Sequence, residues 1–157
     1  MQENINKEII FKDIKFESLL MILEYIYSNR FFPPSVELAI IEKNTTFICN
    51  SNKIILDLFI LSDYFQMDRL KQLCEVNLSQ TLSHEMLIPT LQIAKTYNSE
   101  FLLEFCYWEI GNNFINFQKR KDFKKLEKED LVKIKKFQYP PQEYIDWQKK
   151  YGELNKQ

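Results

Sequence analysis

Apolar and polar positions alternate with a helical period over most of this chain. The period is clearest between Leu61 and Leu78, where two amphipathic runs meet at a short polar joint, Gln66-Met67-Asp68. The apolar residues of the second run recur at the spacing of one helix face, at Leu70, Leu73, Cys74 and Leu78. This pattern predicts a pair of helices that pack on each other, and the pair contains no catalytic group.

Further helices are expected on both sides of this pair. An apolar helical run begins at Phe16 and ends near Ser28-Asn29, before the break at Phe31-Phe32-Pro33-Pro34. Its apolar positions are Leu19, Leu20, Ile22, Leu23, Ile26 and Tyr27. Later periods predict helices at about residues 52–65, 67–80, 84–97, 99–117 and 128–136, with Ser83 and Ser99 as N-caps.

Two segments depart from the helical pattern. Glu8-Ile9-Ile10-Phe11-Lys12 is rich in β-forming residues and predicts a short strand. Residues 30–51 are irregular and are expected to form an insertion, in which Val36 to Ile41 fits either a short strand or half a helix. The fold class expected is therefore mainly α, with one or two short strands that give it a minor α+β character.

Composition restricts the class of protein. A chain of 157 residues can form one domain, or a compact core with a helical extension, and 45% hydrophobic with 27% charged residues is typical of globular proteins. Only two glycines are present, which argues against glycine-rich phosphate-binding loops. The net charge of −1 gives no general attraction to nucleic acid or to acidic membranes, so neither is expected as a partner.

The cysteines and the apolar runs indicate a compartment. The three cysteines, at positions 49, 74 and 106, have no paired spacing, and the odd number argues against a disulfide framework. The chain has no signal-peptide pattern at its start and no apolar run as long as a membrane span. These features predict a reduced, intracellular protein, in the cytoplasm or alternatively in the nucleus.

Few residues offer chemistry for catalysis. Cys74 and Cys106 lie on apolar helix faces, where a free thiol packs as a small hydrophobic group and is inert. His84 is the single histidine, so a two-histidine metalloprotease helix is excluded, and no Cys or Ser with a suitable carboxylate can be tied to it. We therefore expect no enzyme activity, no metal and no cofactor.

Charged residues also have structural interpretations. Asp63 is expected to bind the neighbouring backbone, or to pair with Arg69 or Lys71, rather than to act in a catalytic pair with Glu75. The basic run from Lys119 to Lys136 is interrupted by Asp122, Glu127, Glu129 and Asp130. Since its apolar residues keep a helical spacing, a solvated helix face is favoured over a surface for RNA or phosphate.

The helical pair carries a family resemblance. Its matching positions are Ser62, Asp63, Tyr64, Met67, Leu70, Lys71, Cys74, Glu75 and Leu78. This set resembles the closing helices of a BTB (POZ) domain, whose pattern is roughly A-D-x-Y-x-Φ-x-x-L-K-x-x-C-E-x-x-L. Ser62, in place of the usual Ala, departs from that pattern.

Three further segments extend the resemblance. The strand and first helix are similar to the family's strand and F-x-x-L-L-x-Y-I-Y-T-G segment, through Ile9 to Ile14 and Leu19 to Ser28. The region from His84 to Phe114 resembles the start of BACK, a helical extension that follows many BTB domains. Tyr139-Pro140-Pro141 with Tyr144 is similar to the W-P-P-x-W-Y-L-type tail of Rho-related BTB proteins, although Tyr139 and Glu143 replace the tryptophans.

The resemblance implies a domain organisation. Residues 1–80 would be the C-terminal portion of a BTB domain. The earlier part that such a domain normally has, with the dimer-forming first helix, is not in this sequence, and a truncated gene model, a fragment and a degenerate paralogue all fit. Residues 81–138 would be a BACK-like extension, and residues 139–157 a C-terminal strap with a short helix. The two prolines fit a polyproline-like ligand. A strap that packs its aromatic side chains on the extension is favoured, because Trp147 and Tyr151 lie at i and i+4.

The resemblance also implies a function. In BTB adaptors, an apolar-x-acidic motif and the joint between the last two BTB helices bind cullin-3, the scaffold of a ubiquitin ligase. Met1 and Glu3 match that motif by position, and the joint corresponds to Tyr64, Phe65, Gln66 and Met67. The chain is therefore expected to be a protein-binding substrate adaptor, with its substrate protein unknown. The alternative is a BTB-like protein that forms homo- or hetero-oligomers, or a scaffold, without binding cullin.

Overall fold

The computed structural model describes two compact units, Met1–Met86 and Leu87–Gln157. The described backbone covers residues 2–3, 9–10, 14–33 and 45–146, and side chains are described for residues 14–33 and 50–146. The fold is mainly helical, as the sequence predicts. Within the described residues, every helix is too short or too polar to cross a bilayer.

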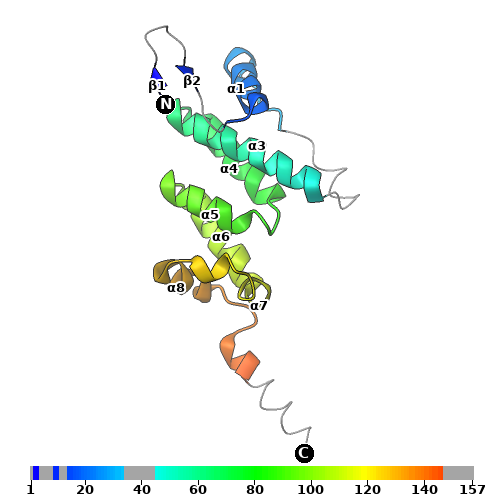
Figure 1. Ribbon diagram of the computed structural model, residues 1–157, viewed down its shortest axis with the longest axis vertical. Coiled ribbons are helices and arrows are strands. Elements are labelled where there is room, and N and C mark those ends of the chain that lie inside the picture. Colours follow the sequence, from blue (N-terminus) through cyan, green and yellow to red (C-terminus); the bar gives the residue numbers. More distant parts are fainter. Residues whose placement is uncertain (1, 4–8, 11–13, 34–44, 147–157) are drawn as a thin grey trace, which may run out of the picture. The chain divides into compact units, whose positions relative to one another are not determined.

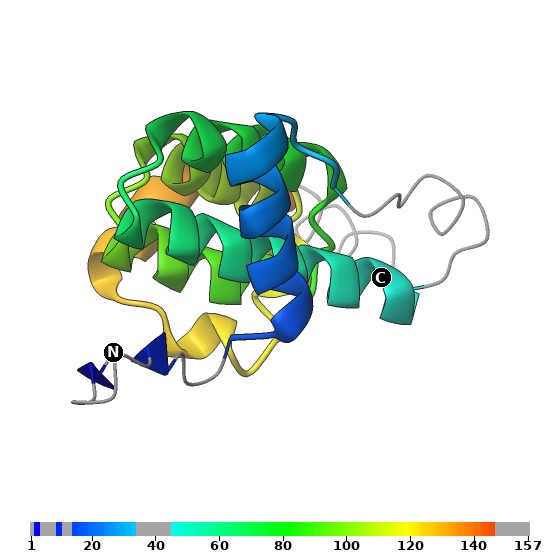
Figure 2. The same cartoon turned by 90° about the horizontal axis from the view of Figure 1, so that it is seen from above.

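In its described residues, the first unit contains a short β pair and the helices α1, α3 and α4. The strands β1 (Gln2–Glu3) and β2 (Ile9–Ile10) are antiparallel, with Gln2 opposite Ile10 and Glu3 opposite Ile9. Helix α1 (Phe16–Ser28) packs against α3 (Thr45–Tyr64), and α3 packs along α4 (Asp68–Thr81). Figures 1 and 2 show α3 and α4 side by side in both views, with α1 crossing α3.

Part of the non-helical prediction lies outside the described residues. Of the strand expected over residues 8–12, the structure describes only Ile9–Ile10, a two-residue ladder with β1. The segment from Val36 to Ile41 is outside the described residues. The next helix was expected from residue 52, but α3 begins at Thr45, so the irregular region expected at 30–51 is shorter than predicted.

Helix α1 ends where the sequence predicts but buries a different face. Its last residue is Ser28, and Asn29 follows in the left-handed region (φ 54°) with its N–H donating to Tyr25 O at 2.8 Å. The buried residues of α1 are Ser18, Ile22 and Tyr25. Of the apolar positions that the sequence marks on this helix, only Ile22 is fully buried, because a polar contact with α3 sets the orientation of the helix.

The contact between α1 and α3 is centred on a buried carboxyl group. Ser18 Oγ lies 3.4 Å from Asp57 Oδ2 and 3.3 Å from Ile54 O, and it donates to these oxygens. Burial raises the pKa of Asp57, although the Lys15 backbone N–H and the charges of Lys53 and Lys15 act in the opposite direction. A serine and an aspartate at the centre of this contact explain why hydrophobicity alone did not predict which face of α1 is buried.

Apolar side chains of α3 and α4 form the core of the first unit. The buried ones are Ile55, Leu56, Leu58, Phe59, Leu61, Leu70, Cys74 and Leu78. Buried Asn52 on α3 binds the C-terminal end of α4. Its Nδ2 donates to Thr81 O at 3.2 Å, and its Oδ1 accepts from Ser83 N at 3.1 Å. This contact satisfies backbone groups at the end of α4 and is not predictable from local sequence.

The second unit is a helical hairpin followed by short helices. The hairpin consists of α5 (Leu87–Thr96) and α6 (Glu100–Asn112). The short helices are α7 (Phe114–Phe117), η1 (Phe123–Lys125) and α8 (Lys128–Lys136), and α8 packs against α6 (Figure 1). The predicted bounds of α8 are confirmed, whereas η1 was not predicted.

The two serine caps have different outcomes. Ser99 is confirmed as the N-cap of α6, since its hydroxyl accepts from Leu102 N at 3.2 Å. The prediction for Ser83 is wrong. Residues 84–86 form a turn in which Met86 N donates to Ser83 O at 2.9 Å, and α5 begins only at Leu87.

The single helix predicted over residues 99–117 is divided at Asn113. Asn113 leaves helical geometry (φ −109°, ψ 27°), and its side-chain amide donates to Glu109 O at 3.1 Å. Gly111, two residues earlier, meets the end of α8: a Cβ there would lie 2.7 Å from Phe137 Cβ and 2.8 Å from Ile134 O. This close approach is a contact between distant segments, so a local period could not reveal it.

A buried polar network joins the three longer helices of the second unit. Tyr107 Oη on α6 donates to Asp130 Oδ1 on α8 at 2.8 Å. Lys95 Nζ on α5 lies 3.1 Å from Asp130 Oδ2 and 2.6 Å from Glu127 Oε2. Burial, followed by the bond to Asp130, raises the pKa of Tyr107. The hydroxyl therefore stays protonated and acts as a donor to the buried carboxylate.

The C-terminal segment is attached through its backbone. Tyr139 N donates to Gly111 O at 2.9 Å, but the Tyr139 side chain is 65% exposed and Tyr144 is also exposed. The expectation of a strap that packs its aromatic side chains on the helical extension stays a prediction. A short helix at residues 142–146 follows, and Trp147 and Tyr151 lie outside the described residues.

Candidate protein-interaction site

The joint between α3 and α4 is a tight turn that brings the predicted site residues together. Gln66 has φ 55°, in the left-handed region. Gln66 N donates to Asp63 O at 3.1 Å, and Met67 N donates to Ser62 O at 2.7 Å. These two bonds form a Schellman motif, which satisfies the last carbonyl groups of α3 and reverses the chain.

The turn places aromatic side chains on the surface. Tyr64 is 53% exposed and Phe65 is 40% exposed, and their rings meet edge to face with centroids 5.2 Å apart. Gln66 is exposed and Met67 is half-buried. Four consecutive residues therefore present a patch of aromatic, amide and thioether groups, which are side chains that suit protein contacts.

Polar contacts hold the joint on both sides. Lys71 Nζ on α4 lies 2.6 Å from Asp63 Oδ1 on α3, which confirms the predicted pairing of Asp63 and selects Lys71 from the two candidates. The same ammonium group lies 5.4 Å from the centroid of the Phe59 ring. Arg69 Nη1 donates to Asn29 Oδ1 at 3.2 Å, so the joint is also tied to the end of α1.

The first turn of α4 lacks the side-chain cap that helices usually have. Met67 is its N-cap residue, and its side chain makes no capping hydrogen bond. Ser, Thr, Asp and Asn are strongly preferred at this position because their oxygen accepts from the first free N–H groups. Methionine there gives up local stability and supplies a flexible apolar side chain at the surface instead.

The second group of predicted site residues is only partly described. Glu3 lies in β1, where the backbone is described but the side chain is not. Met1 lies outside the described residues. The structure therefore assigns the joint residues to one patch and leaves the role of Met1 and Glu3 as a prediction.

The exposed face of α1 is a surface that the sequence did not single out. Its large apolar residues are about half or more exposed and follow one another at helical spacing: Phe16, Leu20, Leu23 and Tyr27. Tyr27 is 88% exposed. The sequence contained the signal, because the apolar positions of this helix extend around more of its circumference than one buried face requires.

Burial makes the two cysteines among the described side chains, Cys74 and Cys106, poor nucleophiles. Burial raises the pKa of Cys106 to about 12 and raises that of Cys74 as well, so both thiols are protonated near neutral pH, as the sequence predicts for inert cysteines. In the part of the chain that the structure describes, no three His, Cys, Asp or Glu side chains gather into a group that could hold a metal ion.

A helical module with an exposed aromatic joint belongs to the class of protein-interaction domains. The comparison with protein families supports this assignment: the model of the BTB/POZ domain matches residues 1–82. The chain therefore belongs to the BTB/POZ family, whose domains mediate protein–protein interactions and oligomerisation.

A curated relative carries the same domain. The chain is 23% identical over 130 residues to a BTB/POZ domain-containing protein of Arabidopsis thaliana. The match covers 83% of this chain and 46% of the relative. The chain thus spans less than half of the length of that protein.

Proposed function

We propose that this chain docks a cullin-3 ubiquitin ligase scaffold, in the manner of a substrate adaptor, through the patch Tyr64–Met67. The observation that carries the proposal is the exposed, edge-to-face pair of Tyr64 and Phe65. Beside this pair lies Met67, which leaves α4 without a side-chain cap. The patch lies in the segment that resembles the cullin-binding joint of BTB adaptors. Recognition of the substrate protein would then depend on other surfaces.

The chemistry of the patch supports a protein partner. Aromatic side chains contribute large contact areas and are enriched where binding energy is concentrated. The Schellman turn and the Asp63–Lys71 ion pair hold these side chains on a rigid backbone, which reduces the entropy lost on binding. In this proposal, Glu3 and Met1 add an acidic and an apolar contact at the edge of the same interface.

The proposal also covers the second unit and the C-terminal tail, which carry the other two parts of the family resemblance. The second unit would be a BACK-like extension, and the tail after Tyr139 would place the chain nearest the Rho-related BTB proteins. The helical hairpin α5–α6 and the proline-containing segment attached to Gly111 are the features that support these two points.

Binding to the purified amino-terminal domain of cullin-3 tests the proposal. The variant Phe65→Ala, Met67→Asp removes the apolar contacts of the patch. Asp at position 67 also supplies the missing N-cap of α4, so this change does not weaken the helix. The matched control is Phe32→Ala, Val76→Asp, which makes the same kinds of change at exposed positions of the first unit outside the joint.

The expected result is retention of wild-type and control protein in a pull-down and loss of the joint variant. No retention of any of the three proteins would contradict cullin binding. Equal retention of all three would contradict the assignment of the patch. Circular dichroism of each variant establishes that the comparison is between folded proteins.

A second function, oligomerisation or scaffolding without cullin, is favoured by the exposed face of α1. Apolar side chains aligned on one helix face are costly to leave in water and are typical of a surface that another protein covers. Sedimentation velocity tests this function with Leu23→Glu, Tyr27→Glu and the control Val76→Glu, Val132→Glu. Self-association of the wild type and the control, together with a monomeric Leu23→Glu, Tyr27→Glu variant, would support this function. The same sedimenting mass for this variant and the wild type would exclude it.

A further inference from the structure

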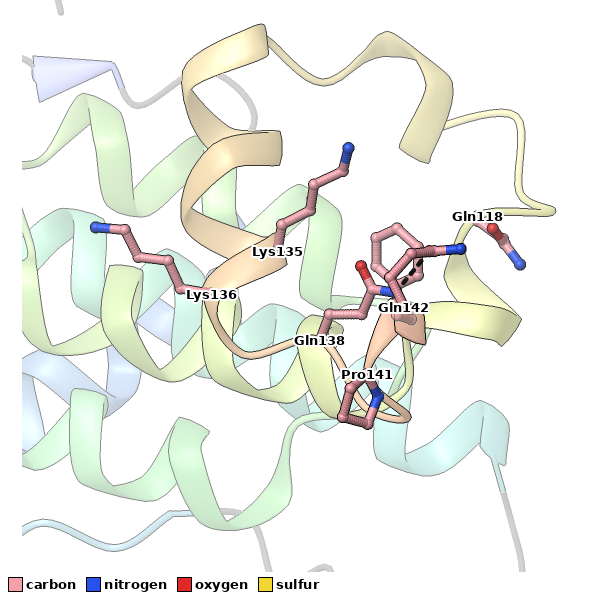
Figure 3. A pocket seen from close by; sticks show the side chains of 7 residues that line it. Gln118, Lys135, Lys136, Gln138, Pro141 and Gln142 are labelled. Carbon is pink, nitrogen blue, oxygen red and sulfur yellow. Dashed lines mark hydrogen bonds between the residues drawn. The ribbon is translucent and has the colours of Figure 1, made fainter. Parts of the chain in front are cut away.

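The second unit contains a pocket that plays no part in the proposed docking at the joint. It has a volume of about 700 Å³, within the usual range for ligand sites. It lies where the end of α8 meets α7 and the segment after α8 (Figure 3). Its walls combine cationic, amide and apolar side chains that come from separate parts of the sequence.

The polar wall consists of hydrogen-bond donors and amides. Lys135 and Lys136 line the pocket from the last turn of α8, with side chains that extend in different directions (Figure 3), and Gln118, Gln138 and Gln142 contribute side-chain amides. None of the residues that line the pocket is acidic. The lining is therefore suited to a ligand that carries negative charge and can also exchange hydrogen bonds with amides.

Two of the glutamines are held in place before any ligand binds. Gln138 Nε2 donates to Gln142 Oε1 at 3.2 Å, and Gln142 Nε2 donates to Asp146 Oδ1 at 2.9 Å. Figure 3 shows the side chains of Gln138 and Gln142 meeting, with Gln118 on the far side. Amides fixed in this way bind at a lower cost in side-chain entropy.

The apolar part of the pocket is rigid. Phe114 is only 8% exposed, and its ring packs edge to face on Phe123 with centroids 5.7 Å apart. Pro141 provides the second apolar surface. These groups can contact the methylene groups of a bound chain, but a buried Phe114 ring offers no free face on which a nucleotide base could stack.

The electrostatic surroundings favour an acidic partner. Residues 119–146, which include the segment after α8, contain nine basic and six acidic side chains, a local charge of +3 in a chain whose net charge is −1. Four of the six acidic groups are already engaged, Asp122 with Arg120, both Glu127 and Asp130 with Lys95, and Asp146 with Gln142. The lysines at the pocket thus lie in a region of net positive charge.

We propose that this pocket binds an extended, acidic peptide segment of a partner protein. Lys135 and Lys136 pair with Asp or Glu side chains, the glutamine amides bind peptide N–H and C=O groups, and Phe114 and Pro141 contact the aliphatic parts. A single small anion is a poorer fit, because exposed lysines without arginine or converging backbone N–H groups hold a point charge weakly.

Fluorescence anisotropy with the full chain tests this site. The probe is a fluorescein-labelled peptide rich in Asp and Glu, and its neutral counterpart has Asn and Gln at those positions. Lys135→Glu, Lys136→Glu is expected to weaken binding of the acidic peptide roughly tenfold, the sum of two modest surface ion pairs and their reversal. Lys124→Glu, Lys125→Glu makes the same change of charge on exposed lysines outside the pocket and is expected to have little effect.

A second variant examines the amides. Gln142→Leu keeps the size of the side chain, removes its donor and acceptor, and is expected to weaken the peptide while leaving the net charge unchanged. An equal loss of affinity for the acidic peptide in both double-lysine variants would overturn the proposal, because it would indicate general attraction to the basic surface instead of binding in the pocket. Equal binding of the neutral peptide, or tighter binding of a labelled oligonucleotide, would overturn it as well. The Phe65→Ala, Met67→Asp variant is expected to bind the peptide normally, so the outcome is independent of cullin docking.

Discussion

The α3–α4 joint and the α5–α6 joint reverse the chain with the same backbone geometry. Each has one left-handed residue, Gln66 (φ 55°) in the first and Asn98 (φ 49°) in the second. Each is closed by a bond from the next residue to a carbonyl five positions earlier, Met67 N to Ser62 O at 2.7 Å and Ser99 N to Ala94 O at 2.9 Å. Both joints are therefore Schellman turns between packed helices.

The side chains of the two joints differ in kind. At the second joint, Asn98 tolerates the left-handed conformation and buried Ser99 caps α6. At the first, Gln66 occupies the left-handed position and Met67 leaves α4 without a side-chain cap. A joint whose residues depart from local stability preferences, and expose aromatic rings at the same place, is typical of a surface selected for binding.

The largest expected effect on the free energy of unfolding is that of removing the Asp130 carboxylate, which binds α5 just before the second joint. Lys95, in the last turn of α5, pairs with buried Asp130, which also accepts from Tyr107. Asp130→Ala leaves both partners without this acceptor and should lower the free energy of unfolding by about 3 kcal/mol. Glu127→Ala, which removes the exposed partner of Lys95, should lower it by less than about 1 kcal/mol. Urea unfolding measures both, and equal effects would contradict the role of burial.

Substitutions at the two N-cap positions, 67 and 99, should change the free energy of unfolding in opposite directions. Met67→Asp adds an acceptor and a favourable charge at the start of α4, so the unfolding free energy should rise by about 1 kcal/mol. Ser99→Ala removes the bond to Leu102 N and should lower it by about 1 kcal/mol. Thermal unfolding followed by circular dichroism tests the pair. A loss of stability in Met67→Asp would show that the thioether contributes to packing and is not simply a contact group.

A smaller effect is expected from the ion pair at the first joint. Lys71→Met keeps the aliphatic stem near Phe59 but removes the contact with Asp63. Because this pair is partly exposed, the loss should be about 0.5 kcal/mol at low salt and should diminish at high salt. Urea midpoints at two salt concentrations provide the measurement, and a loss that does not depend on salt would indicate packing instead of charge.

The smallest effect distinguishes the two left-handed residues. Gln66→Gly relieves the steric cost of a side chain at positive φ but adds conformational entropy to the unfolded chain. The net effect should be a stabilisation of about 0.5 kcal/mol. Asn98→Gly should be close to neutral, because asparagine already tolerates this conformation. A destabilised Gln66→Gly variant, measured by the same urea titration, would reveal a structural role for the glutamine side chain.

Local patterns were sufficient to predict much of the helical framework. The bounds of α8, the end of α1 near Ser28 and the cap at Ser99 all follow from period, turn residues and capping chemistry within a few positions of sequence. The turn at residues 65–67 was located in the same way. These features depend on neighbours along the chain, which a single sequence displays directly.

Features that depend on distant contacts could not be predicted. The break at Asn113 accompanies the approach of Phe137 to Gly111, and the buried face of α1 follows from the contact of Ser18 with Asp57. The pocket likewise joins Gln118 to side chains about twenty positions later. The sequence lists such residues but not their proximity, although it does indicate that the lysines of the basic run are solvated, and in the structure they are exposed.

The distribution of thiols gives the molecule an internal reporter. Cys74 is buried in the first compact unit and Cys106 in the second. A buried thiol reacts with an alkylating reagent only when its surroundings open, so the rate of modification at each position measures the opening of one unit. In a Cys49→Ser background, mass spectrometry of the two cysteine-containing peptides would show whether the units open together or separately. A cullin domain bound at the joint should slow the reaction at Cys74 more than at Cys106.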